Sequence, residues 1–406
     1  MNIPLSAPNI SELEIEYVTR VLRSNQLSLG PVLREFEEKF AGYIGTKYAI
    51  AANSGTSALH MCVRGMELGA GAEVLTTSFS FVASVNCLLY ENVFPRLIDI
   101  DPLTFNLDVN LLREFLRTRC TRNCHGQVID NDTGLVVKGI LPVQVFGMPA
   151  TMDEILEIAA EYDLAVLEDA CEAIGAEHKG RRVGTFGDAA VFAFYPNKQM
   201  TTGEGGMVVT NDSRLAEHCR SLRNQGRDVD GRWLKHVMLG YNYRLNDVQA
   251  ALGLGQLERI EELLHSRAAV AKRYFSLLDG VDSIELPHQD AEAKRSWFVF
   301  VIQVLASDGK SRRDALREHL NGCGIASQTY FPAIHRQPYF QNLGLGQNLQ
   351  LPETEYASDT CLALPFSPHI SEQELQFVAN IIKDGLQEES VTVRTLNGLQ
   401  LQRESL

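Results

Sequence analysis

The chain has 406 residues, of which 45% are hydrophobic and 22% are charged, and this balance is typical of a soluble globular protein with room for two domains. The formal net charge of −14 disfavours binding to nucleic acid or to anionic lipid surfaces. No apolar run approaches the roughly 20 residues of a membrane-spanning helix. The first residues also lack the basic and apolar regions of a signal peptide, so we expect a cytoplasmic protein without a membrane partner.

The eight cysteines are scattered through the chain, which favours reduced thiols over a disulfide framework. Cys120, Cys124 and His125 are the only group with a spacing that resembles metal ligands. They lack a second pair of ligands nearby, so we expect no metal site there.

The first half of the chain alternates between predicted strands and helices after an N-terminal helical arm. The arm consists of two amphipathic segments, Ser6–Ser24 and Val32–Tyr43. Short apolar runs that predict strands then occur at 48–52, 73–77, 96–99, 139–145, 165–168, 189–194 and 207–210, most of them separated by helical patterns. This rhythm predicts an α/β fold with a mostly parallel seven-stranded sheet. Residues 118–135 are polar and aperiodic, which predicts a surface insertion in the crossover rather than a linker.

The second half predicts a smaller α+β domain. Residues 245–278 have a long helical pattern with one charged face, followed by a predicted strand, helix, strand and helix at 296–305, 311–323, 326–330 and 371–386. We therefore expect a large α/β domain over residues 1–255, which includes the helical arm, a small domain over 256–390 and a tail over 391–406.

Lys198 is the first candidate for a chemical role. It lies between an apolar strand and the glycine turn Gly203-Glu-Gly-Gly206, so its side chain is expected to enter the protein. Burial makes the neutral amine available, which is what Schiff-base chemistry with a carbonyl compound requires. An ordinary surface lysine beside a turn is the alternative.

Two further groups are predicted to follow strands of the same sheet. Asn53-Ser-Gly-Thr-Ser57 opens a helix, where backbone N–H groups favour a phosphate; a plain helix cap is the alternative. Asp169 ends an apolar strand, where it could pair with a protonated ring nitrogen or cap the next helix. A phosphate, a pyridine nitrogen and an aldehyde are the three groups that pyridoxal 5'-phosphate presents.

In content and order, these motifs resemble the DegT/DnrJ/EryC1/StrS family of sugar aminotransferases. The resemblance covers nearly the whole chain and rests on Asn53–His60, Ser78–Ala83, Glu168–Ala173, Gly184–Gly187, the stretch from Phe192 to Gly206, Gly240–Arg244, Tyr330–His335 and Leu364–Pro365. It implies a fold-type-I enzyme that depends on pyridoxal 5'-phosphate, in which Lys198 forms the Schiff base and moves protons. It also implies that Asp169 bonds to the pyridine nitrogen.

The same resemblance implies further contacts to the cofactor. Gly55 and Thr56 would hold the phosphate, and Phe81 would stack on the ring. Asn242 would reach the phosphate of the neighbouring subunit's cofactor, which implies a homodimer with shared active sites. Arg244 could meet the carboxylate of an amino-acid donor. Core packing, a turn position and a surface ion pair are the respective alternatives for Phe81, Asn242 and Arg244.

Two further residues, His335 and Gln26, are candidates for substrate contacts, and two positions depart from the family's usual pattern. Ala193 replaces a phosphate-binding serine found in many relatives. Glu172 occupies a position near the ring hydroxyl where histidine or glutamine is common; a side chain pointing to solvent or capping a helix is the alternative. Lys198 stands where the dehydratase branch has histidine, which favours transamination over C–O elimination.

The resemblance implies transfer of an amino group to a nucleotide-linked keto-sugar, such as a 4-keto-6-deoxy sugar, in surface polysaccharide or related amino-sugar biosynthesis. L-Glutamate is the expected donor. A cyclitol or another free ketone is an alternative acceptor. A non-catalytic regulator that binds pyridoxal 5'-phosphate and a structural α/β scaffold are alternatives from other classes.

Overall fold

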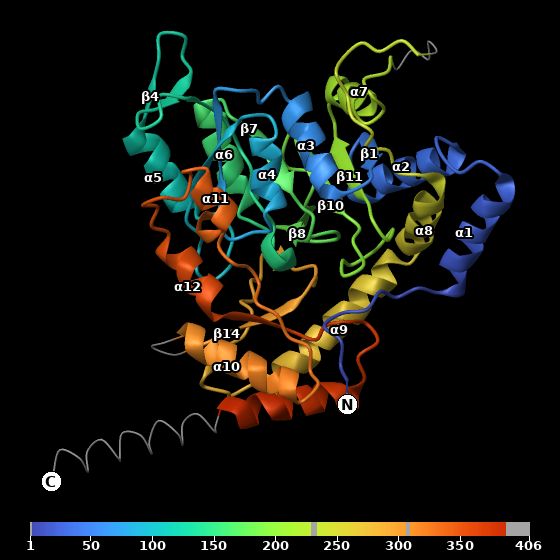
Figure 1. Cartoon of the computed structure of the whole chain (residues 1–406), viewed down its shortest axis with the longest axis vertical. Helices are drawn as coiled ribbons and strands as arrows, with labels where there is room; N and C mark the ends of the chain where they lie inside the picture. The colour runs from blue at the N-terminus through green and yellow to red at the C-terminus, as the bar shows by residue number, and fades with distance from the viewer. Residues whose placement is uncertain (1, 229–233, 306–308, 387–406) are drawn as a thin grey trace.

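A computed structural model shows an α/β protein built around one large sheet (Figure 1). It describes residues 2–228, 234–305 and 309–386. Seven strands follow one another in the spatial order β1 (Tyr48–Ala52), β11 (Gly206–Thr210), β10 (Ala189–Ala193), β7 (Ala165–Asp169), β6 (Val136–Ile140), β2 (Ala72–Thr77) and β3 (Phe94–Ile98). The predicted seven-stranded core of the sheet is confirmed.

The strands between β10 and β3 are all parallel to their neighbours, and only β11 runs antiparallel to β1 and to β10. Every residue of β2 and of β11 is buried. Residues on both sides of these two strands are buried because helices cover both faces of the sheet.

Helices cover the sheet on both sides. One core cluster joins the sheet to α3 (Gly55–Gly65), α4 (Ala83–Leu89) and α7 (Ser213–Leu222). Two others join it to α2 (Pro31–Ile44), α8 (Asp247–Glu258), α5 (Val109–Arg119) and α6 (Met152–Tyr162). Because parallel strands place their carboxyl ends along one edge, the loops that leave β2, β7 and β10 meet there.

The segment 118–135 is a surface insertion in the connection between α5 and β6, as the sequence predicts, and most of its residues are exposed. It contains a hairpin of β4 (Cys120–Arg122) and β5 (Val128–Asp130), which pairs with β6 and widens the sheet to nine strands. One of its charged residues, Asp130, is nevertheless fully buried and forms an ion pair with Arg96. A paired charge can enter the interior, so polarity alone does not predict exposure here.

A second region lies below the large sheet in Figure 1 and is reached through the long helix α9 (Ile260–Leu278). Its three-stranded sheet has the order β12 (Ile284–Glu285), β14 (Phe300–Val304) and β15 (Cys361–Leu364). It shares a core with α9, α10 (Gly309–Gly322) and a helix over 372–386. A third small sheet consists of β8 (Glu177–His178), β9 (Arg181–Arg182) and β13 (Ala293–Lys294).

Three predicted elements differ in detail. The first helix, α1, spans only Glu12–Ser24, because Ser11 caps it and Glu14 completes a capping box. The long helical pattern at 245–278 is two helices, which end and begin on either side of Arg259. The strand predicted at 326–330 is wrong, since this segment forms only isolated bridges.

Two segments cross between the regions. Ile3 pairs with Ile325 and lies in the core of the second region. Conversely, the short helices η2 (Ile334–Arg336) and α11 (Pro338–Asn342) pack beside the large sheet, with Ile334 in one cluster with Val85 and Leu97, while α12 (Pro352–Thr360) lies mainly against α10 and β14. The domain division at residue 255 therefore stays a prediction, and the predicted tail at 391–406 falls outside the described residues.

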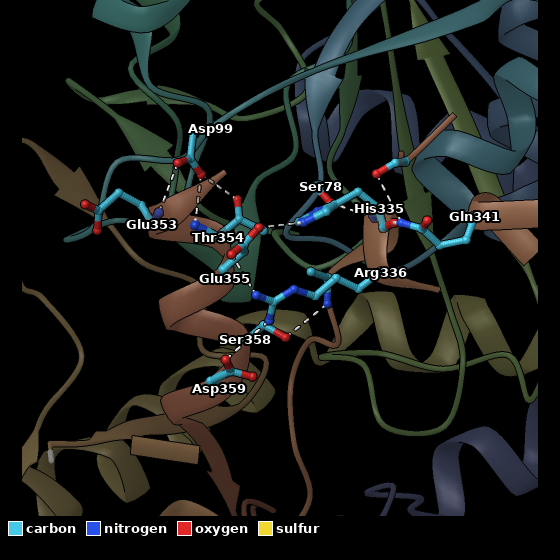
Figure 2. A network of polar contacts seen from close by, with 12 residues as sticks. Ser78, Asp99, His335, Arg336, Gln341, Glu353, Thr354, Glu355, Ser358 and Asp359 are labelled. Atoms are coloured by element: carbon cyan, nitrogen blue, oxygen red, sulfur yellow. Dashed lines mark hydrogen bonds and ion pairs between the residues drawn. The ribbon is translucent and has the colours of Figure 1, made fainter. Parts of the chain in front are cut away.

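Asp99, just after β3, anchors α12 (Figure 2). Its carboxylate accepts hydrogen bonds from the N–H of Glu353 at 3.0 Å, the N–H of Thr354 at 2.8 Å and the hydroxyl of Thr354 at 2.7 Å. The two N–H groups are unpaired donors of the helix N-terminus, so Asp99 caps α12 from a distant part of the chain.

Candidate active site

Lys198 lies in the turn that follows β10, as the sequence predicts. Its N–H donates to the carbonyl of Tyr195 at 2.9 Å, and its side chain is only 13% exposed. The Nζ atom lies 3.4 Å from Oε1 of Glu172 and 3.8 Å from the ring centre of Phe298. The amine therefore lies between a carboxylate and an aromatic face, away from bulk water.

Arg267, on α9, holds the backbone of this turn and was not predicted as a site residue. Its guanidinium donates to the carbonyl of Lys198 at 2.7 Å and to the carbonyl of Phe298 at 3.1 Å. Arg267 is 2% exposed, and burial lowers its pKa to about 10. Among the described residues it forms no ion pair with a carboxylate. One buried cation thus ties the lysine turn to the residue whose ring faces Nζ.

Glu172 points inward, and the alternative of a solvent-facing side chain is wrong. Its Oε2 accepts a hydrogen bond from the N–H of Phe146 at 2.9 Å, while Oε1 faces Lys198. Burial raises the pKa of the Glu172 carboxyl, although the charge of Lys198 opposes this increase. When Glu172 is ionised, its negative charge therefore lies beside the amine of Lys198.

Asp169 ends β7 and is buried close to the same place. Its Oδ1 accepts from the N–H of Cys171 at 3.1 Å, and its Oδ2 accepts from the hydroxyl of Ser84 at 2.6 Å. No ion pair to Asp169 is present in the described part of the chain, so the carboxylate is held by neutral donors alone. It retains lone pairs for a proton on a ligand.

The N-terminus of α3 has the form of an anion cradle. The cap Ser54 accepts from the N–H of Ser57 through its side chain and from that of Ala58 through its carbonyl, which leaves the N–H groups of Gly55 and Thr56 for a ligand. A Cβ on Gly55 would lie 2.7 Å from the Cβ of Ala193 and 3.1 Å from Sγ of Cys171. Only glycine fits there without displacing its neighbours.

This contact also places Ala193 directly against the cradle. Many relatives in the family that the sequence resembles carry serine at this position. A pocket of about 400 Å³ opens on the same helix and is lined by Ser54, Thr56, Ser57, His60, Tyr90 and Tyr243. The backbone donors, the buried carboxylate and the amine fit the phosphate, the ring nitrogen and the aldehyde of pyridoxal 5'-phosphate.

The other predicted residues are less close together. Phe81 is 60% exposed and so is not a core residue, and Gln26 and Asn242 are also exposed. Arg244 donates to Oδ1 of Asn224 at 3.0 Å, and burial lowers its pKa. The roles of these residues stay predictions.

His335 is buried, and both of its ring nitrogens have partners (Figure 2). Nδ1 lies 2.8 Å from the hydroxyl of Ser78, and Nε2 lies 3.1 Å from Oε1 of Glu355. Burial lowers the pKa of His335, which favours the neutral ring. In this position the imidazole braces the loop that carries Phe81, and a direct substrate contact stays a prediction.

Within the described ranges, no three His, Cys, Asp or Glu side chains come together as a metal site. None of the helices there is long and apolar enough to cross a membrane.

A buried lysine, a strand-end aspartate and a glycine-containing cradle lie at one edge of a mostly parallel sheet. This arrangement defines a fold-type-I enzyme that uses pyridoxal 5'-phosphate. Comparison with known proteins specifies the family. Residues 8–383 match the model of the DegT/DnrJ/EryC1/StrS aminotransferase family, and the chain belongs to this family. The predicted family, enzyme class and cofactor are confirmed.

Similar proteins cover nearly the same length. GDP-perosamine synthase of Caulobacter vibrioides is 37% identical over 84% of this chain and 87% of its own. The structure of Helicobacter pylori PseC, an aminotransferase involved in the biosynthesis of pseudoaminic acid, superposes with a TM-score of 0.87 at 27% identity, covering 96% of this chain and all of its own. That of S. venezuelae DesV in complex with a ketimine intermediate has a TM-score of 0.83 at 31% identity, covering 94% and 98%.

Proposed function

We propose that this aminotransferase transfers an amino group from L-glutamate to a nucleotide-linked keto-sugar, for surface polysaccharide or related amino-sugar biosynthesis. The names of the relatives support a sugar acceptor, because one is a GDP-perosamine synthase and another serves pseudoaminic acid biosynthesis. The observation that carries transamination is the position of Lys198, whose Nζ lies 3.4 Å from Glu172 inside the site.

The chain's own residues suffice for the proton transfers. Pyridoxal 5'-phosphate, when bound, supplies an electron sink for the pair left on the substrate carbon after its proton departs. Asp169 holds a proton at the ring nitrogen, and the N–H groups of Gly55 and Thr56 bind the phosphate. Nζ of Lys198 takes the proton from the amino-acid substrate and gives it up again. Phe81 orients the ring by stacking.

We also propose a homodimer with shared sites. Asn242 is exposed, and the preceding segment has three exposed apolar side chains, Leu234, Val237 and Leu239. Exposed apolar surface of this kind favours a covered interface. In a dimer, Asn242 would contact the phosphate at the partner's site, and Arg244 would receive the donor carboxylate.

The position of the cofactor lysine is tested by reduction. Borohydride treatment of the holoprotein should fix the cofactor to the peptide that contains Lys198, as read by peptide mass spectrometry. Lys198→Ala should remain folded and lose turnover by several orders of magnitude, because nucleophile and proton carrier disappear together. Labelling of another lysine would contradict the assignment.

The acceptor is tested with a panel of nucleotide-linked keto-sugars and free cyclitol ketones, each incubated with glutamate and followed by mass spectrometry. We expect amination of at least one nucleotide-linked sugar and no amination of the free ketones. Turnover of free ketones alone would establish the alternative acceptor. Cofactor binding without any amination, in wild type as in Lys198→Ala, would instead favour a regulator.

A further inference from the structure

The hydroxyl of Ser84, in the first turns of α4, touches the carboxylate that is proposed to face the cofactor ring. Ser84 is fully buried, and its Oγ lies 2.6 Å from Oδ2 of Asp169, 2.7 Å from Oγ of Ser80 and 3.2 Å from the carbonyl of Phe81. Ser80 is also buried, and its Oγ lies 3.3 Å from the carbonyl of Phe81. The two serines thus flank the residue proposed to stack on the ring.

The chemistry of these groups determines which of them donates each hydrogen bond. An ionised carboxylate only accepts hydrogen bonds, so the single hydroxyl proton of Ser84 points to Asp169 in the shortest of its three possible bonds. The oxygen of Ser84 then accepts, and the hydroxyl of Ser80 is the donor that meets it. The result is an ordered chain from Ser80 to Ser84 to Asp169.

Such a chain of hydrogen bonds acts on the charge and the orientation of the carboxylate. A donor on the ionised form stabilises it relative to the protonated form. A second hydroxyl behind the first strengthens the bond by polarisation. The bond also fixes the plane of the carboxylate, because Oδ2 is tied to α4 and Oδ1 to the N–H of Cys171.

We propose that Ser84, supported by Ser80, is a positioning residue that holds the Asp169 carboxylate with its free lone pairs toward the ring nitrogen, so that the proton of the Asp169–cofactor contact resides on the ring nitrogen. This inference rests on the proposed role of Asp169. Because Ser84 and Asp169 are 85 positions apart, only the fold brings them together.

The test reads the ring nitrogen directly. The protein is loaded with pyridoxal 5'-phosphate labelled with ¹⁵N in the ring, and the ¹⁵N resonance is recorded for wild type, Ser84→Ala and Ser80→Ala. We expect the resonance of Ser84→Ala to move toward the unprotonated value, with a smaller movement for Ser80→Ala. The kcat of Ser84→Ala should fall about tenfold while KM stays within about twofold, since one charge-assisted hydrogen bond is lost. Ser84→Thr, which retains the hydroxyl, should restore the resonance.

Ser221→Ala is the matched control, because Ser221 is equally buried and donates to the backbone carbonyl of Arg227 at 2.8 Å, without contact to Asp169. It should leave the resonance in place. Asp169→Asn tests the role of Asp169 separately from the role of Ser84. If Asp169→Asn leaves the resonance unchanged, the proposed role of Asp169 fails. If Asp169→Asn moves the resonance but neither serine variant does, the positioning role of Ser84 is overturned. If Ser84→Ala does not fold, the resonance of Ser80→Ala tests the positioning role instead.

Discussion

The substitution Arg267→Met tests whether Arg267 positions the turn that carries Lys198. Burial lowers the pKa of Arg267 to about 10 from its ordinary 12.5, so keeping this side chain charged costs about 3 kcal/mol. Its two shorter hydrogen bonds, to the carbonyls of Lys198 and Phe298, contribute about 1.5–3 kcal/mol each. Together the two hydrogen bonds contribute about 3–6 kcal/mol, which exceeds the cost by up to about 3 kcal/mol.

Methionine has a similar length, and burying it contributes about 1.5–3 kcal/mol, while each carbonyl left without a donor costs about 1–3 kcal/mol. Taking the middle of each range, we expect the free energy of unfolding to fall by about 3 kcal/mol. The rate of catalysis should fall as well. The lysine turn loses its anchor, and a displacement of about 1 Å can lower the rate about 100-fold.

The assay combines urea unfolding, followed by fluorescence, with steady-state kinetics. Arg273→Met is the matched control, because Arg273 lies on the same helix but is exposed and forms a surface ion pair with Glu372. Its kcat should stay within about twofold of wild type. A stable Arg267→Met with an unchanged kcat would refute the positioning argument. A loss of more than about 6 kcal/mol in the free energy of unfolding would refute the balance of energies given above.

Glu172→Gln should lower the pH midpoint of the colour change of the lysine-bound cofactor by roughly one pH unit in a spectral titration, because a neighbouring negative charge that favours the protonated nitrogen is removed; an unchanged or raised midpoint would contradict this. Mixing inactive Lys198→Ala with weakened Asn242→Ala should recover activity once subunits exchange, since one site of a mixed dimer is intact, and no recovery after confirmed exchange would count against shared sites. Asp99→Ala should lower the free energy of unfolding by about 2–3 kcal/mol in urea titration, because the first turn of α12 loses its cap; the half-exposed Asp359→Ala should cost less than about 0.5 kcal/mol, and equal losses would argue against the cap.

The parts of the fold that local patterns encode were predictable. Continuous apolar runs placed the strands of the large sheet, because burial on both faces leaves no room for alternation. Glycine, lysine and aspartate at the ends of these runs pointed to one edge of the sheet, and the structure brings Gly55, Asp169 and Lys198 close together there.

The residues that the sequence did not reveal act across long separations. Arg267 belongs to an amphipathic helix in which a charged residue reads as surface, and nothing local shows that backbone carbonyls receive it in the interior. Ser84 looks like an ordinary helix residue until α4 packs beside β7. Asp130 was assigned to a polar insertion because its partner, Arg96, lies on another strand.

Residues from the later part of the chain hold the site in place on two sides. His335 bonds to Ser78 at the end of β2 and thereby supports the loop of Phe81, while Arg267 and the segment before β14 hold the turn of Lys198. The large sheet supplies the cofactor groups, but their geometry depends on segments that join it much later in the sequence. Binding of the cofactor and ordering of the later segments should therefore be coupled, because each fixes the same two loops.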